Sequence, residues 1–219
     1  QSLEPIGNGA EWLAITHSSL FTETLRLAEQ RETHSRLTTH IVTAEEIFAQ
    51  YGHGLPLPQA IHAYLQHAKT TWEIAPNYVL LVGDASLNPR GLACQGSCFS
   101  DWTTADENLI PTFLEPLDRH IGLVPVDHFY TLLEGEDDLP DVAIGRLPVQ
   151  NSAELAPVID KIITYEQNLV NPTDGTQDIL FVTDNADNAG DFCFYSNASA
   201  DHWPQQFGTT QLCLDELDN

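Results

Sequence analysis

The run of residues 78–82, YVLLV, constrains the fold more than any other feature, because it is apolar throughout and leads directly into Gly83 and Asp84. An uninterrupted short apolar run is typical of a strand that is buried on both faces, as in a parallel sheet covered by helices. Segments with the apolar spacing of helices alternate with such strands, at about 18–32, 44–51, 58–72 and 152–170. The alternation predicts an α/β fold with a parallel sheet, and ligand sites are expected at the carboxyl ends of its strands.

Several other segments are also predicted as strands: residues 11–17, 36–43, 141–147, 178–185 and 209–215. The stretch 87–123 is rich in proline and glycine, which predicts an irregular loop or a small hairpin. The last strand–helix–strand unit, with helix-compatible residues near 195–206, would leave a parallel sheet with few partners. We therefore expect the natural domain to continue past Asn219 or to dock onto another chain.

The charge balance of the 219 residues is strongly acidic, with 8 basic residues against 32 acidic ones and a formal net charge of -24. This balance argues against binding to nucleic acid or to an anionic membrane surface, and no apolar run approaches the length of roughly 18 residues that a membrane span needs. Solubility is the simplest explanation of the acidity. The chain starts at Gln1 and contains no methionine, so we expect a mature or excised segment.

The cysteines form two local pairs, Cys94 with Cys98 and Cys193 with Cys213. An even number in local pairs predicts two disulfides in an oxidising compartment, and hence a secreted or cell-surface protein. A zinc site is the alternative. It is less favoured because the chain has no Cys-x-x-Cys motif with a histidine doublet nearby.

His53 lies between two glycines and raises the question of whether it is the general base of a cysteine peptidase. Glycine just beyond a helix accommodates the left-handed conformation, and Pro56 and Pro58 prevent the preceding helix from continuing. A catalytic histidine would be expected at the end of a buried strand, facing a thiol. The sequence therefore favours a helix stop.

Two acidic loops carry hard oxygen ligands that calcium could use. Asp184, Asp187 and Asp191 follow one predicted strand, while Asp137 and Asp138 lie in an acidic turn. The spacing in the first of these loops does not fit the EF-hand pattern. Solvated, mutually repelling carboxylates are the simpler interpretation, and a structural calcium ion is the alternative and the cofactor that the sequence suggests.

Residues 124–168, preceded by YVLLVGDAS, resemble the gingipain family of cysteine endopeptidases. The likeness rests on four features: the strand ending in Gly83 and Asp84, Asp127 within residues 124–130, the acidic turn at 135–138, and the segment IGRLP at 144–148, which runs into a helix with Glu154, Lys161, Tyr165 and Glu166. Weaker similarity extends to both ends, so the resemblance covers nearly the whole chain.

The resemblance implies a caspase-like architecture, a parallel-sheet three-layer sandwich in two side-by-side subdomains. Residues 1–150 would form the first subdomain, and residues 151–219 the connecting helix and the incomplete start of the second, catalytic one. In the family the catalytic pair is a histidine in a Gly-His-Gly after an apolar strand and a later cysteine, both in the second subdomain. Neither is in this sequence, since its only Gly-His-Gly, at His53, falls in the first subdomain.

The resemblance also assigns roles to individual residues. Asp191 is the nearest match, shifted by one residue, to the acid that selects a basic side chain in the substrate pocket of the family. Arg146 is expected to pair with Asp127 or Asp84 at the join between the subdomains. Structural roles are implied for Gly83, Asp84, Asp127, Gly145 and Arg146.

The sequence thus predicts the N-terminal part of a secreted gingipain-like cysteine endopeptidase, a scaffold for a His/Cys pair that lies beyond this chain. Its partner would be the remainder of the parent polypeptide or another copy, with a protein as the candidate substrate. The alternative is a non-catalytic surface or assembly module that keeps the fold.

Overall fold

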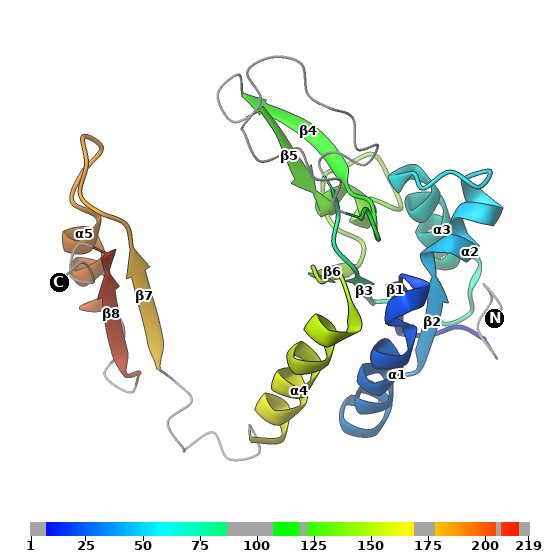
Figure 1. Cartoon of the computed structure of the whole chain (residues 1–219), viewed down its shortest axis with the longest axis horizontal. Helices are drawn as coiled ribbons and strands as arrows, with labels where there is room; N and C mark the ends of the chain where they lie inside the picture. The colour runs from blue at the N-terminus through cyan, green and yellow to red at the C-terminus, as the bar shows by residue number, and fades with distance from the viewer. Residues whose placement is uncertain (1–7, 87–106, 119–121, 169–177, 205–206, 215–219) are drawn as a thin grey trace. The chain divides into compact units, whose positions relative to one another are not determined.

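The computed structural model describes residues 8–86, 107–118, 122–168, 178–204 and 207–214 (Figure 1). Their contacts divide the chain into two units, Gln1–Ile163 and Thr164–Asn219. The sequence analysis places the boundary at 150/151, just before helix α4 (Ser152–Asn168), and α4 runs across the division between the units. The domain limits 1–150 and 151–219 stay a prediction.

The first unit is built on a four-stranded parallel sheet in the order β2-β1-β3-β6. Its strands are β1 (Trp12–Thr16), β2 (Thr39–Thr43), β3 (Tyr78–Val82) and β6 (Ala143–Leu147). All five residues of the central strand β1 are buried, which is why this strand is apolar nearly throughout. The sheet confirms the predicted α/β fold class.

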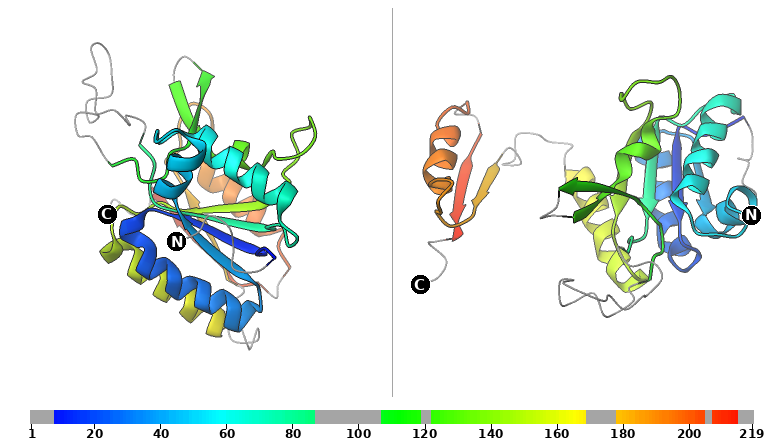
Figure 2. Two further views of the ribbon diagram at one scale, coloured as in Figure 1. Left: turned by 90° about the vertical axis from the view of Figure 1, so that its right-hand side faces the viewer. Right: turned by 90° about the horizontal axis from the view of Figure 1, so that it is seen from above.

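Helices cover both faces of this sheet and give the three layers (Figure 2). Leu13 and Ile15 of β1 lie in a core shared with helices α2 and α3, whereas Trp12 and Ala14 lie in a second core shared with α1 and α4. The alternation along β1 is that of a strand whose successive side chains point to opposite faces. The bounds of these helices are α1 (Phe21–Gln30), α2 (Ala44–Tyr51) and α3 (Pro58–Thr71).

Helix α2 begins and ends as its local sequence predicts. Thr43 and Glu46 form the capping box, in which the Thr43 backbone N–H donates to Glu46 Oε2 at 3.2 Å. After the helix, His53 takes the left-handed conformation with a φ of 52° and is exposed to solvent. His53 therefore lies in the turn that ends α2, as the sequence analysis favours.

Short helical turns and a hairpin complete the first unit. The turns are η1 (Ser18–Leu20), the π-helical η2 (Arg31–Ser35) and η3 (Asp127–Thr131). The antiparallel hairpin consists of β4 (Phe113–Asp118) and β5 (Gly122–Val126), so it begins in the second half of the segment 87–123 that is predicted as a loop or small hairpin and ends three residues beyond it. The first half of that segment lies outside the described residues.

The second unit contains two parallel strands, β7 (Ile179–Thr183) and β8 (Thr209–Cys213), with the helix α5 (Phe192–Ala200). The sequence analysis places this helix at about 195–206, three residues too late at its start. Asp191 explains the difference, because its Oδ1 accepts a hydrogen bond from the Phe194 backbone N–H at 2.9 Å and caps the helix.

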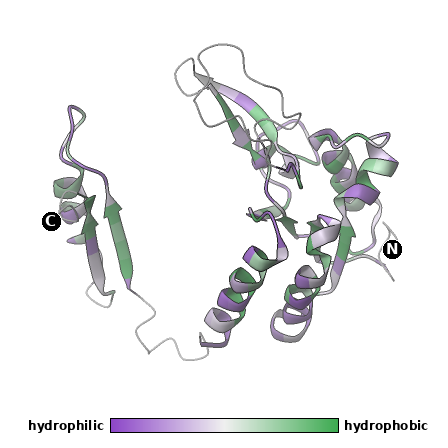
Figure 3. Ribbon diagram, in the orientation of Figure 1, coloured by the Kyte–Doolittle hydropathy of each residue, from purple (hydrophilic) through white to green (hydrophobic). Residues whose placement is uncertain are grey.

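One face of the β7–β8 sheet is apolar and uncovered within this unit. Leu180 and Val182 alternate along β7, and Leu212 pairs with Val182 across the strands; the exposed fractions are 59%, 65% and 36%, respectively. Figure 3 shows hydrophobic colour along β7. Among the hydrophobic residues that the structure describes in this unit, Cys213 alone is buried, so the unit has little core of its own.

Two glycines on the first sheet should respond oppositely to the same substitution. At Gly83, φ is 140° and a Cβ would lie 2.8 Å from Ile110 Cγ1 and 3.0 Å from Leu109 Cβ, whereas a Cβ on Gly145 would lie 3.8 Å from Leu80 Cδ1. Gly83→Ala is expected to destabilise the chain by about 2 kcal/mol through strain and overpacking. Gly145→Ala is expected to stabilise it by about 0.5 kcal/mol. Urea denaturation of both variants checks this, and a Gly83→Ala chain as stable as the wild type would contradict it.

Candidate functional site at the carboxyl edge of the sheet

The carboxyl ends of β3 and β6 lie side by side because the two strands are parallel neighbours. The backbone N–H of Gly83 donates to the carbonyl of Leu147 at 3.0 Å, and that of Asp84 donates to the carbonyl of Val149 at 3.0 Å. These bonds hold the segment after β3 against the segment after β6. Ligand sites in parallel α/β sheets form at this edge.

Arg146 organises the edge with all of its N–H donors. Its Nε and Nη2 form a bidentate pair with Asp127, at 2.7 Å to Oδ2 and 2.8 Å to Oδ1. Nη1 donates to the carbonyls of Gly83 at 2.9 Å and Ile110 at 2.8 Å, and Nη2 donates to that of Pro111 at 3.3 Å. The Arg146 side chain is only 13% exposed. A guanidinium with five donors engaged in this way joins two segments of backbone, at Gly83 and at residues 110–111, to the Asp127 carboxylate.

The electrostatics of this cluster keep Asp127 ionised. Burial alone would raise the pKa of the Asp127 carboxyl, but the hydrogen bonds and charge of Arg146 and the hydroxyl of Thr112, at 2.7 Å, hold that pKa below its usual value. Burial raises the pKa of Tyr130. The positive charge of Arg146 acts against this increase, and the negative charge of Asp127 adds to it. The neutral Tyr130 hydroxyl donates to the Pro111 carbonyl at 2.6 Å.

Asp84 is the other carboxylate considered for Arg146, and the structure gives it different partners. Its Oδ1 accepts from the Ala85 backbone N–H at 2.9 Å, and its Oδ2 accepts from Gln150 Nε2 at 2.9 Å. No described cation lies within ion-pair distance of Asp84. Of the two carboxylates, Arg146 therefore pairs with Asp127.

Two cavities adjoin at this edge and share Ser86 and Thr112 in their walls. The polar cavity, about 420 Å³, is lined in addition by Asp84, Ala85, Pro125, Asp127, Arg146 and Pro148. The apolar cavity, about 600 Å³, is lined in addition by residues 55–59, Asn108, Pro111 and residues 113–115. Both volumes fall in the range of ligand pockets.

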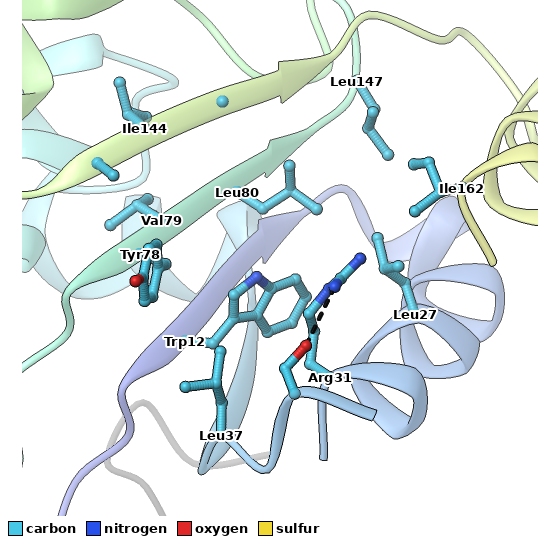
Figure 4. Close-up of a pocket in the computed structure, with 13 residues that line it drawn as sticks. Trp12, Leu27, Arg31, Leu37, Tyr78, Val79, Leu80, Ile144, Leu147 and Ile162 are labelled. Atoms are coloured by element: carbon cyan, nitrogen blue, oxygen red, sulfur yellow. Dashed lines mark hydrogen bonds between the residues drawn. The ribbon is translucent and has the colours of Figure 1, made fainter. Parts of the chain in front are cut away.

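A third cavity, about 580 Å³, lies on the sheet face that α1 and α4 cover (Figure 4). Trp12, Leu37 and Leu80 form part of its apolar wall, and Arg31 donates to the Ser35 hydroxyl at 3.3 Å. The described residues that line it include neither a histidine nor a cysteine. This cavity therefore offers no His/Cys pair.

The acidic residues considered as calcium ligands stabilise their own loops. Asp137, Asp184 and Asp187 each accept a hydrogen bond from a backbone N–H one or two residues further on, and Asp138 is exposed. Within the described part of the chain, no group of three or more histidine, cysteine or acidic side chains is placed to hold a metal ion. The calcium site stays a prediction.

The remaining predicted site residues lie in the second unit or outside the described residues. Asp191 caps α5, and its role in a substrate pocket stays a prediction. Cys193 of α5 and Cys213 of β8 form a disulfide, and the structure describes no free cysteine. Cys94 and Cys98 fall outside the described residues, so their pairing also stays a prediction.

Sequence reasoning missed Thr112, which shapes the edge, and it named Asp141 only as a further candidate calcium ligand of the acidic turn, without its role in closing that turn. Thr112 reaches Asp127 only because the hairpin folds back, so no local pattern could have paired them. Asp141 accepts from the backbone N–H groups of Glu134 and Leu133, both at 2.8 Å, and these bonds lower its pKa. The acidic turn is thus closed by one of its own carboxylates.

A parallel sheet between two helical layers, with a salt-bridged carboxyl edge, defines a three-layer α/β domain of the caspase-like kind. The model of peptidase family C25 matches residues 6–218. The chain therefore belongs to peptidase family C25, a family of cysteine peptidases.

Solved structures share this fold. The Arg-specific cysteine proteinase gingipain R (RgpB) matches with a TM-score of 0.63 and 19% identity, over 96% of this chain and 43% of that chain. The complex of Porphyromonas gingivalis RgpB pro- and mature domains matches with a TM-score of 0.62 and 19% identity, over 92% of this chain and 42% of that chain. Dimeric latent PorU from Porphyromonas gingivalis matches with a TM-score of 0.56 and 24% identity, over 75% of this chain and 16% of that chain.

These identities establish similarity of fold alone, and the chain spans less than half the length of each of these structures. No curated protein sequence matches the chain.

Proposed function

We propose that this chain is the N-terminal scaffold of a secreted gingipain-like cysteine endopeptidase whose catalytic histidine and cysteine lie beyond these 219 residues. One observation carries the proposal: the family model matches residues 6–218, while the chain covers only 43% of the gingipain R structure. Under this proposal both catalytic residues lie in the part of the domain that this chain does not include.

The second unit supports the proposal physically. Leu180, Val182 and Leu212 form an exposed apolar sheet face, and a stable α/β domain covers such a face with another layer. The remainder of the parent polypeptide, or another copy of it, is the proposed partner. A complex of pro- and mature domains and a dimer among the similar structures support this choice of partner.

Secretion belongs to the same proposal. The disulfide between Cys193 and Cys213 supports an oxidising compartment. In the described residues, no helix combines the length and the apolar character that crossing a membrane requires.

In this proposal the chain positions the reacting groups but does not supply them. A thiolate would attack the peptide carbonyl, the histidine would carry the proton to the leaving amine, and backbone amides would hold the oxyanion. The rigid carboxyl edge around Arg146 and Asp127 would fix the first subdomain beside that centre.

The experiment compares this chain with a longer one that contains the downstream polypeptide. The downstream sequence should hold an apolar strand ending in Gly-His-Gly and a later strand ending in cysteine, and the longer protein should cleave peptides in a reaction that a thiol alkylator blocks. The chain alone should be inert. A longer protein without thiol-dependent hydrolysis would favour the non-catalytic surface or assembly module instead.

A further inference from the structure

The two cavities at the carboxyl edge share wall residues, and we call the two together the groove, which has an apolar part and a polar part. Its apolar part has Leu55 and Leu57 in the wall, with exposed fractions of 56% and 43%, and both leucines are followed by prolines. Its polar part is lined by Asp84 and by the Arg146–Asp127 pair, and Ser86 and Thr112 belong to both parts. Two exposed leucines at the wall of a cavity offer apolar surface for a ligand to cover.

The charged residues of the groove that have no partner of opposite charge are acidic. Arg146 and Asp127 neutralise one another in a bidentate pair. Asp84 lies in the polar part and has no cationic partner among the described residues, and Glu115 is exposed at the apolar end. A ligand of complementary charge would therefore carry a basic group next to an apolar one.

Strand β4 borders the apolar part and favours an extended ligand. Residues 113–115 of β4 line the cavity, and β5 is the strand that pairs with β4 within the described part of the chain. Pro116 lies within β4, and proline is confined to edge strands and bulges because it cannot donate to a ladder. A strand edge beside pockets for side chains is the arrangement in which peptides bind by strand addition.

We propose that this groove is a docking site for an extended peptide segment with apolar side chains next to a basic one. The segment lies along β4, with its apolar side chains against Leu55 and Leu57 and its basic group at Asp84. The site deepens the proposed function, because it would hold a stretch of the polypeptide on which the peptidase acts. The docking site rests on the proposed function in one respect, because that function identifies the bound polypeptide as one on which the peptidase acts.

The test measures peptide binding to this chain by fluorescence anisotropy. The probe is a labelled peptide of about eight residues with alternating leucine and threonine and one arginine, near the upper end of usual strand lengths. Two comparison peptides replace the arginine with glutamate or the leucines with serine. The arginine–leucine peptide should bind at least about tenfold more tightly than either, which is about 1.4 kcal/mol.

Leu57→Asp should weaken binding of the arginine–leucine peptide about tenfold. Leu57 precedes α3 at its N-cap, where aspartate is favourable, so this variant should remain folded. Leu139→Asp is the matched control, since Leu139 is 69% exposed, lies outside the groove, and the variant adds the same charge. It should bind like the wild type.

Asp84→Asn should remove most of the preference for arginine over glutamate, while Asp137→Asn, an equally local change in an exposed turn, should not. Equal affinity for all three peptides, or equal losses in Leu57→Asp and Leu139→Asp, would overturn the proposal. The binding measurement needs no catalytic residue. Peptide binding can therefore fail while the longer protein cleaves peptides, and it can succeed while the longer protein does not.

Discussion

Arg146→Met is expected to lower the free energy of unfolding of the first unit by about 3 kcal/mol, the lower end for breaking a buried ion pair. Methionine keeps most of the aliphatic bulk but removes every N–H donor. Asp127 would lose its cation, and the carbonyls of Gly83 and Ile110 would lose a hydrogen bond each. Urea denaturation followed by circular dichroism measures the loss as a lower midpoint at constant slope.

Two further measurements show whether the loss comes from the pair itself. Arg146→Lys should fall between the wild type and Arg146→Met, because an ammonium keeps the charge but not the bidentate geometry. The pKa of Asp127 is lower in the folded state than in the unfolded state. The contribution of Asp127 to the stability of the fold is therefore fully present above the unfolded pKa of about 4, and it is lost as the pH falls through the lower folded pKa. As the pH falls through that range, the free energy of unfolding of Arg146→Met should therefore decrease less than that of the wild type. A loss below about 1 kcal/mol at neutral pH, typical of surface pairs, would contradict the structural role.

The sheet of the first unit could be predicted because each strand carries its own signal. The run at β3 is apolar because Val79 and Leu81 are buried in one core and Val82 in the other, although Tyr78 at its start is exposed. Gly83 after it has a backbone conformation that favours glycine. Helix α2 is marked by the capping box of Thr43 and Glu46, and α3 by Pro58 in its first turn. Such signals are local, so they survive without knowledge of the fold.

The carboxyl edge could be predicted only in part, because its contacts join residues far apart in the chain. Arg146 meets Asp127 across 19 residues and Thr112 meets Asp127 across 15, and both contacts depend on how the hairpin folds back. Sequence alone therefore left Asp84 and Asp127 as equal partners for Arg146. The adjoining cavities have no sequence signature, since five separate segments build their walls, within 55–59, 84–86, 108–115, 125–127 and 146–148.

Replacing both Cys193 and Cys213 with serine is expected to unfold the second unit and leave the first folded. A disulfide that closes a loop with a sequence separation of 20 residues contributes about 3 kcal/mol. That is a large fraction of the stability of so small a unit, in which Cys213 is the one buried hydrophobic residue that the structure describes. Limited proteolysis with mass spectrometry should find rapid cleavage within residues 178–214 and protection of the first sheet.

Ser196→Ala is the matched control, because the Ser196 hydroxyl also joins α5 to β8, through a hydrogen bond of 3.1 Å to Gln211. Its loss should cost only about 1 kcal/mol and leave the cleavage pattern unchanged. Reductant added to the wild type should reproduce the double variant, and a double variant as resistant as the wild type would show that packing holds the unit. If downstream polypeptide covers Leu180 and Val182, the same double substitution should be less damaging in the longer protein.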